Sequence, residues 1–565
     1  MDLNVKQHLP SLVLLFGLTV VAVFLRSNSA LFVPVAEDLD FAFRLMIAGT
    51  VIAVFRNEIG MSTFGVFGPV ILAFSWVVVG PFWGFLVIAY IFVLTALARV
   101  AIIDLNLGTP HRVASLLVVA AIGLFVIEAA GQLQDIPSLQ AVILFPVVLT
   151  TWYAERFVGS LTETGWVPAT RRLAATLIGI AAAFAIITFE PLVTLVIHSP
   201  ELWVALVAVN IALGTLTDVR LGEYLRFREL RRSLGKDNAS DVLTMRVRNR
   251  EFINKYNPAP IMAQFNKGEM KKTLHGLSIP TTATYLIAED ESDFDELRTL
   301  LETQPTFAIK PIDGYGGRDI LVVRGRDEAT NEFLTNRGRL TADEIVAHTR
   351  NICVGGVGDY GARREALVEG FITPDGLLAD RTTGGVPDLR VITLQGFPVM
   401  SMVRLPTDES NGTANIHTGA VAVAIDILTG EASGGYQQTR DAFIQSHPDT
   451  GADLEFTIPE WEAVLAMASR AAISSGLGFA GVDIVFDEAN GPMVLEVNRR
   501  PGLGIQNANM DGLLRRLRYV EDHGDHGQFQ SATDRVRRAQ EWAKQDWKTF
   551  TQPSTDREIR SEVKA

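Results

Sequence analysis

Three oxygen-bearing side chains lie close together near the end of a predicted β-hairpin. The stretch 481–503, GVDIVFDEANGPMVLEVNRRPGL, contains two runs of strand length, VDIVF and MVLEV, joined by a turn with Asn and Gly. Glu496 and Asn498 are two residues apart and share one face of the second strand, which Asp483 reaches from the neighbouring strand. Oxygen ligands without Cys or His suit Mg²⁺, which usually acts beside nucleotide phosphates. The alternative is a surface hairpin with scattered acids.

Lysines and glycines suited to phosphate oxygens precede this hairpin. Lys267 begins a helix predicted over 268–275, where an anion is favoured, although a solvated lysine is the alternative. The stretch FAIKPIDGYGGRDILVV predicts a strand over 307–310, then a loop and a second strand over 320–323. The loop glycines let backbone N–H groups turn toward phosphate: Gly314, Gly316 and Gly317. Because no helix follows, the loop fits neither the P-loop nor the dinucleotide pattern, and we expect a flap over a nucleotide.

Further strands present polar groups after this loop. ALVEGFITPDG, 366–376, predicts a strand and a turn whose edge can offer backbone groups to an adenine, with Phe371 nearby. PDLRVITLQGFPVMSMVRLP predicts two strands around a Gly turn, and these carry Asp388, Arg390 and Arg404. The next stretch brings Asn415 and His417, and for His417 hydrogen bonding within a loop is the alternative to catalysis.

Length and composition limit the possible classes of protein. The 565 residues suffice for three or four domains, and the single cysteine, Cys353, excludes an intramolecular disulfide and a Cys-rich zinc site. The net charge of −13 argues against a general nucleic-acid binder. The mean hydropathy of +0.23 averages an apolar half, 1–220, and an ordinary soluble half, 221–565.

The apolar half contains eight hydrophobic runs: 10–26, 40–55, 63–79, 81–104, 113–133, 138–154, 172–197 and 200–218. Several approach the ~20 residues that span a bilayer, but the second and sixth are short, so seven or eight spans are predicted. The first run lacks a small-residue cleavage site and is followed by more spans, which predicts an anchor and not a removed signal peptide. Glu128 in the fifth run is either a functional group inside the membrane or a solvated group near its surface.

Basic residues gather in alternate loops between these runs. The loops after the second, fourth and sixth runs are basic, whereas the others carry acids: Glu37, Asp38, Asp40, Asp135 and Glu201. The positive-inside rule therefore predicts a multi-pass protein of the cell membrane with both termini and the soluble half in the cytoplasm. The basic stretch 220–236 is either a topology-setting flank or a contact for anionic headgroups. The predicted spans carry no series of charged residues of the kind that would indicate a transport pathway.

The motifs of the soluble half occur in the order seen in ATP-grasp ligases: Lys267, Lys310-Pro311, the Gly-rich flap, VEGFI, DLR, NIHTGA and the hairpin ligands. Over about 245–520, stretches such as RVRNREFINKYNP, HPDTG and NRRPGLGIQNAN resemble the alpha-L-glutamate ligase-like branch, related to the enzyme that adds glutamates to a ribosomal protein. The apolar half, through MSTFGVFGPVILAF at 61–74, is similar to the seven-helix module often linked to an inactive transglutaminase. Two departures from the ligase pattern are Arg318 in the flap and Arg499.

The resemblance implies a multi-domain fold: a polytopic α-helical membrane bundle of seven or eight helices and an α+β ATP-grasp domain. We expect four segments: a transmembrane module at 1–219, a basic linker at 220–244, the ATP-grasp domain at 245–520 and a charged, partly disordered tail at 521–565. The tail is expected to be helical around 533–549.

The resemblance also implies an activity, in which ATP phosphorylates a carboxylate and an amine then displaces the phosphate. The product would carry glutamate or another amino acid on a peptide, protein or small-molecule acceptor. The alternative is a nucleotide-responsive membrane regulator with little ligase turnover. The identities of the carboxylate and of the acceptor stay open.

The site residues implied by the resemblance fall into four groups. One or two Mg²⁺, or Mn²⁺ in their place, would be held by Asp483, Glu496 and Asn498. ATP would be bound through its phosphates by Lys267, Lys310 and the flap glycines, with Lys310 alternatively at the adenine edge, and through adenine and ribose by Glu369, Phe371 and Ile372. The substrate carboxylate or acyl-phosphate oxygens would meet Arg390 and Arg500, since arginine binds such groups bidentately. Further substrate contacts would come from Asn415 and His417.

Overall fold

The computed structural model describes residues 5–102, 109–140, 144–164, 166–216, 219–312, 319–354, 365–524 and 531–547. The chain divides into a first unit, Met1–Arg226 with Val354–Arg363, and a second unit, Phe227–Cys353 with Arg364–Ala565. Each unit has hydrophobic cores of its own.

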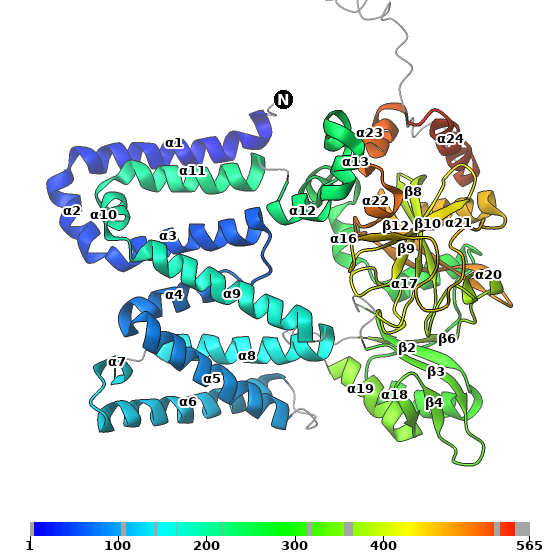
Figure 1. The fold of residues 1–565 in the computed structure, drawn as a ribbon, viewed down its shortest axis with the longest axis horizontal. Helices are drawn as coiled ribbons and strands as arrows, with labels where there is room; N and C mark the ends of the chain where they lie inside the picture. The colour runs from blue at the N-terminus through cyan, green and yellow to red at the C-terminus, as the bar shows by residue number, and fades with distance from the viewer. Residues whose placement is uncertain are drawn as a thin grey trace, which may run out of the picture. The chain divides into compact units, whose positions relative to one another are not determined.

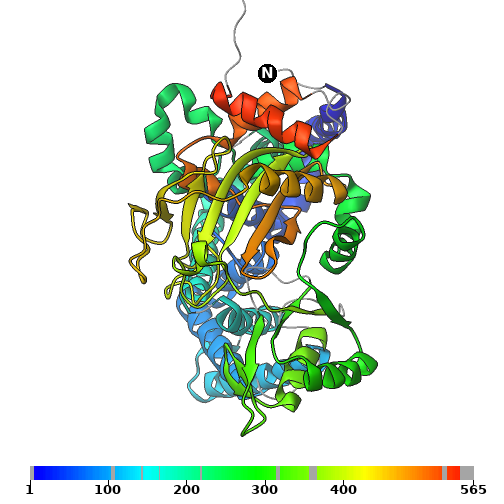
Figure 2. The ribbon, with the colours of Figure 1, turned by 90° about the vertical axis from the view of Figure 1, so that its right-hand side faces the viewer.

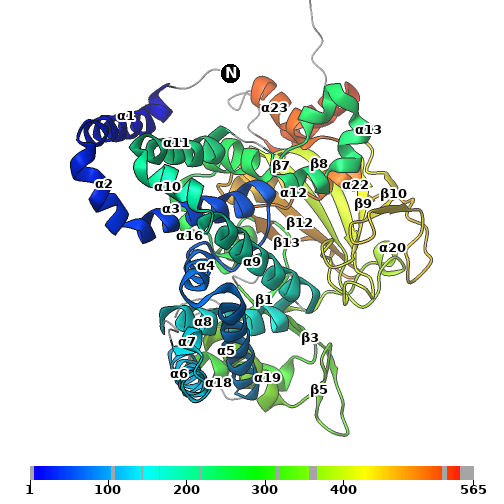
Figure 3. The ribbon, with the colours of Figure 1, turned by 60° about the vertical axis from the view of Figure 1, so that its left-hand side comes forward.

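The described part of the first unit is built of helices joined by short connections (Figure 1). Its longer helices are α1 (Val5–Ser27), α3 (Asp40–Val54), α4 (Phe67–Val79), α5 (Pro81–Ala101), α6 (Thr109–Leu133), α8 (Leu144–Thr164), α9 (Trp166–Ile187) and α11 (Pro200–Leu216). Shorter elements are α2 (Ser29–Asp38), the π-helix η1 (Phe55–Ile59), α7 (Pro137–Gln140), α10 (Glu190–His198) and α12 (Leu221–Arg226). Figure 3 shows α1 beside α11, and the two helices are in contact.

Within the described residues, each predicted hydrophobic run falls mainly on helix, although the run 63–79 becomes helical only at Phe67. The run 172–197 is divided between α9 and α10, and α8 continues past residue 154 to Thr164. Four helical segments of the described chain are long and apolar enough to span a membrane: Pro10–Ser27, Pro81–Ala101, His111–Leu133 and Trp166–Ile187. The pair α10 and α11, bent by 103°, would make a fifth span. The predicted seven or eight spans are therefore reached only by including the shorter or more polar helices.

Charged groups in this unit are paired between helices. Arg44 on α3 donates to Asp40 at 2.7 Å, to Glu190 at 3.0 Å and to the Ile187 carbonyl. Buried Glu155 on α8 lies 2.8 Å from the Nε atoms of both Arg99 and Arg112. Removing a partner from such a buried group leaves a charge uncompensated, so these contacts favour one arrangement of the helices.

Glu128 lies differently from those paired groups. It is exposed on α6 and makes no ion pair among the residues that the structure describes. Its predicted functional role within the membrane therefore stays a prediction.

The second unit contains two antiparallel sheets, seen apart in Figure 2 as green strands and as yellow to orange strands. The six-stranded sheet has the order β1 (Thr284–Ala288), β6 (Ala366–Gly370), β2 (Phe307–Pro311), β3 (Leu321–Arg326), β4 (Phe333–Thr335) and β5 (Gly338–Leu340). Its core packs against two amphipathic helices, α18 (Glu291–Thr303) and α19 (Ala342–Val354). The strands predicted over 307–310 and 320–323 are confirmed as β2 and β3.

The seven-stranded sheet has the order β11 (Ala442–Ile444), β10 (Ala432–Gln437), β9 (Val421–Ile425), β8 (Phe397–Leu405), β7 (Asp388–Leu394), β12 (Phe479–Asp487) and β13 (Gly491–Asn498). One core lies between this sheet and two helices, α17 (Lys267–Gly276) and α21 (Trp461–Ser474). The core on the other face includes α13 (Arg228–Asn238), α22 (Ile505–Asn509), α23 (Leu513–His523) and α24 (Ala532–Lys544). The remaining short elements are η2 (Ala239–Asp241), α14 (Met245–Val247), η3 (Arg248–Ile253), α15 (Asn254–Tyr256), α16 (Ala259–Gln264) and α20 (Gly376–Ala379).

Side-chain alternation explains how this sheet carries polar groups inside the molecule. Leu389 and Val391 of β7 face the first core, together with Val403 of β8. Their chain neighbours Asp388 and Arg390 therefore point to the opposite face, because successive side chains of a strand alternate. Both are nevertheless buried, which requires that each finds a partner.

The helix predicted within the tail corresponds to α24. Its apolar side is buried through Val536, Ala539 and Trp542. Residues 548–565 lie outside the described chain, so the predicted disorder there stays a prediction.

Candidate active site

The β12–β13 hairpin brings the three predicted metal ligands together. Asp483 stands directly opposite Glu496 in the register of the two strands. Asn498 bridges them, because its Nδ2 donates to Asp483 Oδ2 at 2.9 Å and to Glu496 Oε1 at 3.0 Å. Two carboxylates and one amide thus form a single polar cluster at the end of the sheet.

Two arginines from neighbouring strands approach the same cluster. Arg390, opposite Asp483 in the β7–β12 register, donates from Nε and Nη2 to the two Asp483 oxygens at 2.7 and 2.6 Å. Arg404 donates from Nε to Asp388 Oδ1 at 2.6 Å and from Nη2 to Asp483 Oδ2 at 3.0 Å. Arg404 was not among the predicted site residues, although the sequence places it on the strand after DLR.

Three lysines form the other side of the site. Lys267 Nζ donates to Glu496 Oε2 at 2.7 Å, and Lys310 Nζ lies 2.5 Å from Glu369 Oε1. Lys271, which the sequence reasoning missed, donates to Glu369 Oε2 and to the Thr282 hydroxyl. The missed signal was its spacing of four residues from Lys267, which places both on one face of α17.

These lysines converge on one small cavity of the second unit. Its polar lining is Lys267, Lys271, Lys310 and Glu496, and apolar side chains of α17, β6 and β13 complete it. Primary amines beside an enclosed space suit the oxygens of a phosphorylated ligand.

Two protein families match separate parts of this chain. Residues 247–522 match the family described as sugar-transfer associated ATP-grasp. The second unit contains an ATP-grasp domain. Residues 21–231 match the family described as 7 transmembrane helices usually fused to an inactive transglutaminase, which confirms the predicted membrane module. A comparison with curated proteins found no match.

Solved structures similar to this chain include ATP-grasp ligase PsnB complexed with a minimal precursor, at 16% identity and a TM-score of 0.27, covering 47% of this chain and 63% of that one. D-cycloserine synthetase DcsG is 14% identical, with a TM-score of 0.28 and coverage of 50% and 73%. A RimK domain ATP-grasp protein from Sphaerobacter thermophilus is 15% identical, with a TM-score of 0.26 and coverage of 46% and 70%. The chain spans less than two thirds of PsnB, and similarity at this level assigns no substrate.

Burial and ion pairing shift the pKa values of side chains in the ATP-grasp site. Burial would raise the pKa of Glu369, but Lys310 and Lys271 outweigh it and lower that pKa to about 2. Burial and the like charge of Lys310 lower the pKa of Lys271 to about 8. Burial raises the pKa of Asp388 to about 6, against the opposing effect of Arg404.

The residues predicted around adenine lie on and after β6 of the ATP-grasp domain. Both Glu369 oxygens are engaged by lysines, so the structure gives this side chain an ion-pairing role. Ile372 is buried in a small apolar cluster with Val485 and Met493, and Phe371 is half-buried. Gly314, Gly316 and Gly317 of the predicted flap, with Arg318, lie outside the described residues.

The structure does not bring the remaining predicted residues into the cluster. Arg500 is exposed and makes no polar contact within the described chain. Asn415 accepts from the backbone N–H of His417 at 3.0 Å, and its carbonyl accepts from Thr418 and Ala420. Asn415 therefore holds the NIHTGA turn, and His417 is exposed on it.

His447 of the HPDTG stretch has a structural place. Its buried ring contacts the Pro406 carbonyl through Nε2 at 3.0 Å, while Nδ1 accepts from the backbone N–H groups of Asp449 and Thr450. These partners fit a neutral imidazole with its proton on Nε2. Burial also lowers the pKa of His447, which favours the same neutral form.

Proposed function

We propose that this protein is a membrane-anchored, ATP-dependent ligase that joins a carboxylate to an amine in the cytoplasm. The observation that carries the proposal is the meeting of Asp483, Glu496 and Asn498 with a row of lysines in an ATP-grasp domain. The carboxylate or the amine would belong to glutamate or another amino acid. A peptide, a protein or a small molecule would be the other partner.

The donor set fits a magnesium ion, because Asp483, Glu496 and Asn498 all carry hard oxygen atoms within one cluster. When bound, Mg²⁺ neutralises phosphate charge and holds the nucleotide in line for transfer. Lys267, Lys271 and Lys310 would bind phosphate oxygens at the cavity that they line. Arg390 and Arg404 would hold anionic oxygens of the substrate, since their guanidinium groups point to the same face of the sheet.

A membrane regulator that binds a nucleotide without ligation is the second candidate. It is favoured by one observation: protein N–H donors already contact both Asp483 oxygens, one at Oδ1 and three at Oδ2. A regulator would bind ATP tightly without requiring a carboxylate and an amine.

The deciding experiment measures ADP release by the detergent-purified protein with Mg²⁺-ATP. The panel contains amino acids and peptides, together with sugar-bearing molecules, because the matched family is described as sugar-transfer associated. We expect ADP release that depends on a particular substrate pair and that falls at least about 100-fold in Asp483→Ala, the scale of losing one transition-state stabilising group. Tight ATP binding without turnover over the whole panel would favour the regulator, and turnover retained in Asp483→Ala would contradict the assigned site.

A further inference from the structure

Four hydrogen-bond donors contact the buried carboxylate of Asp483. It receives both arms of Arg390, one Nη2 bond from Arg404 and one Nδ2 bond from Asn498. Three of these N–H groups reach Oδ2 and one reaches Oδ1, and Arg390 alone among the donors contacts both oxygens. The side chain is 1% exposed, which leaves no open approach from solvent.

The amide of Asn498 is turned the wrong way for a metal ligand. Its Nδ2 faces Asp483 and Glu496, which are both acceptors. Exchanging the positions of its nitrogen and oxygen would set an oxygen against two carboxylate oxygens, so the hydrogen-bond network fixes this orientation. Coordination of a cation by all three side chains therefore requires Asn498 to turn, which also removes its hydrogen bond to Asp483 Oδ2.

The two arginines differ in how firmly they depend on Asp483. Arg404 is held by both oxygens of Asp388 and reaches Asp483 through only one additional bond. Arg390 makes both of its hydrogen bonds to Asp483, and among the described residues Asp388 and Glu496 attract its charge without a hydrogen bond. Asp388 can therefore hold Arg404 in place without Asp483. Loss of the bonds to Asp483 would instead release both hydrogen-bonding N–H groups of Arg390.

We propose that the Arg390 guanidinium and a divalent cation are alternative occupants of the Asp483 carboxylate. Arrival of the cation would displace Arg390, whose fork then becomes available to anionic oxygens of the nucleotide or the substrate. This inference rests on the proposed function, because it uses the magnesium site named there. Arg390 would act as a positioning residue that couples cation binding to anion binding.

The coupling follows from thermodynamic reciprocity. A cation that must displace Arg390 binds more weakly by the free energy of that ion pair. An anion that attracts Arg390 strengthens cation binding by the same factor by which the cation strengthens anion binding. The site would therefore resist a divalent cation alone and accept it together with a phosphorylated ligand. Arginine suits this exchange, because its planar fork binds carboxylate and phosphate with the same geometry.

The test measures binding of Mn²⁺ alone to the intact, detergent-purified protein, from the electron paramagnetic resonance signal of free Mn²⁺. We expect Arg390→Met to bind Mn²⁺ more tightly than the wild type by about 5- to 150-fold, the usual range of coupling between sites. Arg470→Gln removes one positive charge from the exposed side of α21 but no contact with Asp483, so we expect little change in it. Arg390→Lys, which keeps the charge and loses the fork, should lie between wild type and Arg390→Met.

A second readout keeps the test valid if Arg390→Met is unstable. Its melting temperature should rise more on addition of Mn²⁺ than that of the wild type, because a bound cation stabilises the folded state. Equal Mn²⁺ affinity in wild type, Arg390→Met and Arg390→Lys would overturn the exchange and leave the ligase proposal standing. Failure of the wild type to bind Mn²⁺ even with ATP would overturn the metal site itself.

Discussion

Ion pairs fix the positions of individual side chains in the ATP-grasp site. Glu369 on β6 receives Lys271 from α17 and Lys310 from β2, so one carboxylate joins three elements. Lys271 is almost fully buried and also bonds Thr282, which makes it the best enclosed of the lysines at the site. A buried charge with two partners fixes local geometry more strongly than an exposed one, because each unmet partner costs desolvation free energy.

We expect Lys271→Met to lower the free energy of unfolding of the ATP-grasp domain by about 1–3 kcal/mol, because it removes a buried ammonium that pairs with Glu369 and leaves the Thr282 hydroxyl as the donor to Glu369 Oε2. Affinity for ATP should fall as well, since Lys271 lines the cavity. The matched control is Lys272→Met at the next residue, whose exposed side chain should leave stability nearly unchanged. Thermal unfolding and nucleotide titration of both variants provide the comparison, and equal effects would contradict this role for Lys271.

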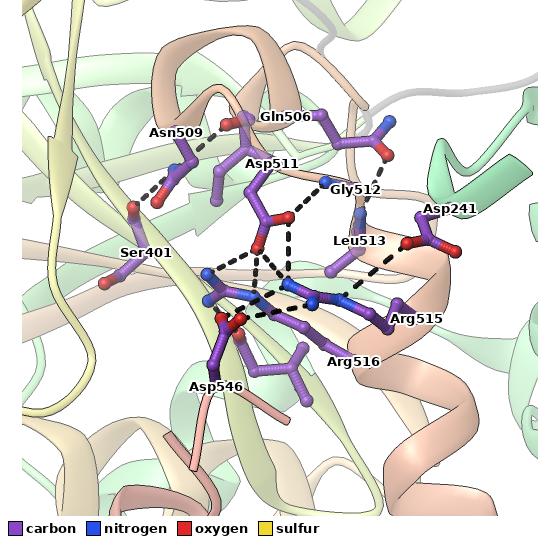
Figure 4. A network of polar contacts seen from close by, with 12 residues as sticks. Asp241, Ser401, Gln506, Asn509, Asp511, Gly512, Leu513, Arg515, Arg516 and Asp546 are labelled. Carbon is purple, nitrogen blue, oxygen red and sulfur yellow. Dashed lines mark hydrogen bonds and ion pairs between the residues drawn. The ribbon is translucent and has the colours of Figure 1, made fainter. Parts of the chain in front are cut away.

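At the scale of elements, polar contacts attach the C-terminal helices to the rest of the second unit. Figure 4 shows Asp511 beside Arg515 and Arg516 of α23, with Asp241 and Asp546 on either side. Asp511 accepts from Arg516 Nε at 2.9 Å and from Arg515 Nη2 at 3.2 Å. Asp241 and Asp546 come from distant parts of the chain, so this network ties the segment before the ATP-grasp core to the end of α24.

Buried Gln506 on α22 reinforces this connection. Its Oε1 accepts from the backbone N–H of Leu243 at 2.7 Å and of Leu513 at 3.0 Å, and its Nε2 donates to the Leu243 carbonyl at 3.0 Å. One amide therefore satisfies backbone groups of two segments that lie far apart in the chain.

We expect Asp511→Ala to destabilise the second unit by about 1–3 kcal/mol, because two arginines lose a carboxylate that they share in a partly buried place. Asp534→Ala removes an exposed ion pair with Arg537 and a hydrogen bond from the hydroxyl of Ser531, the residue that caps α24. The cost should be about 1 kcal/mol or less, because exposed ion pairs contribute little to stability. Chemical unfolding followed by Trp542 and Trp547 fluorescence would report on the same region. A smaller effect for Asp511→Ala than for Asp534→Ala would argue against the network.

At the scale of the whole molecule, a helical membrane module and an ATP-grasp domain share one chain. The two family matches, 21–231 and 247–522, leave only a short segment between them. The first unit exposes many large apolar side chains on its helices, such as Phe16 and Phe24 on α1 and Phe125 on α6. Such exposure is stable where lipid, not water, surrounds the helices.

The distribution of basic loops predicts the orientation of this module. We expect green fluorescent protein at the C-terminus to fluoresce and alkaline phosphatase there to be inactive, because the positive-inside rule keeps that end in the cytoplasm. Alkaline phosphatase fused in the turn at Asp135, between α6 and α7, should be active. The reverse pattern would place the ATP-grasp domain on the other side of the membrane and remove it from cytoplasmic ATP.

The sequence by itself determined the elements and the chemistry that they carry. Strand alternation in the hairpin predicted that Glu496 and Asn498 share a face, and the structure joins them to Asp483. Hydrophobic runs predicted the helices of the first unit, because a segment that crosses lipid must be apolar along its whole length. These features depend on the spacing of nearby residues, which the sequence states directly.

Only the tertiary structure decided which distant groups meet. Arg390 faces Asp483 because β7 lies between β8 and β12 in the sheet, and that strand order is not encoded in the local pattern of either strand. Lys271 likewise meets Glu369 through the docking of α17 near β6, almost a hundred residues along the chain. The sequence therefore predicted a metal-binding carboxylate in Asp483, whereas packing revealed that arginine N–H groups already engage it.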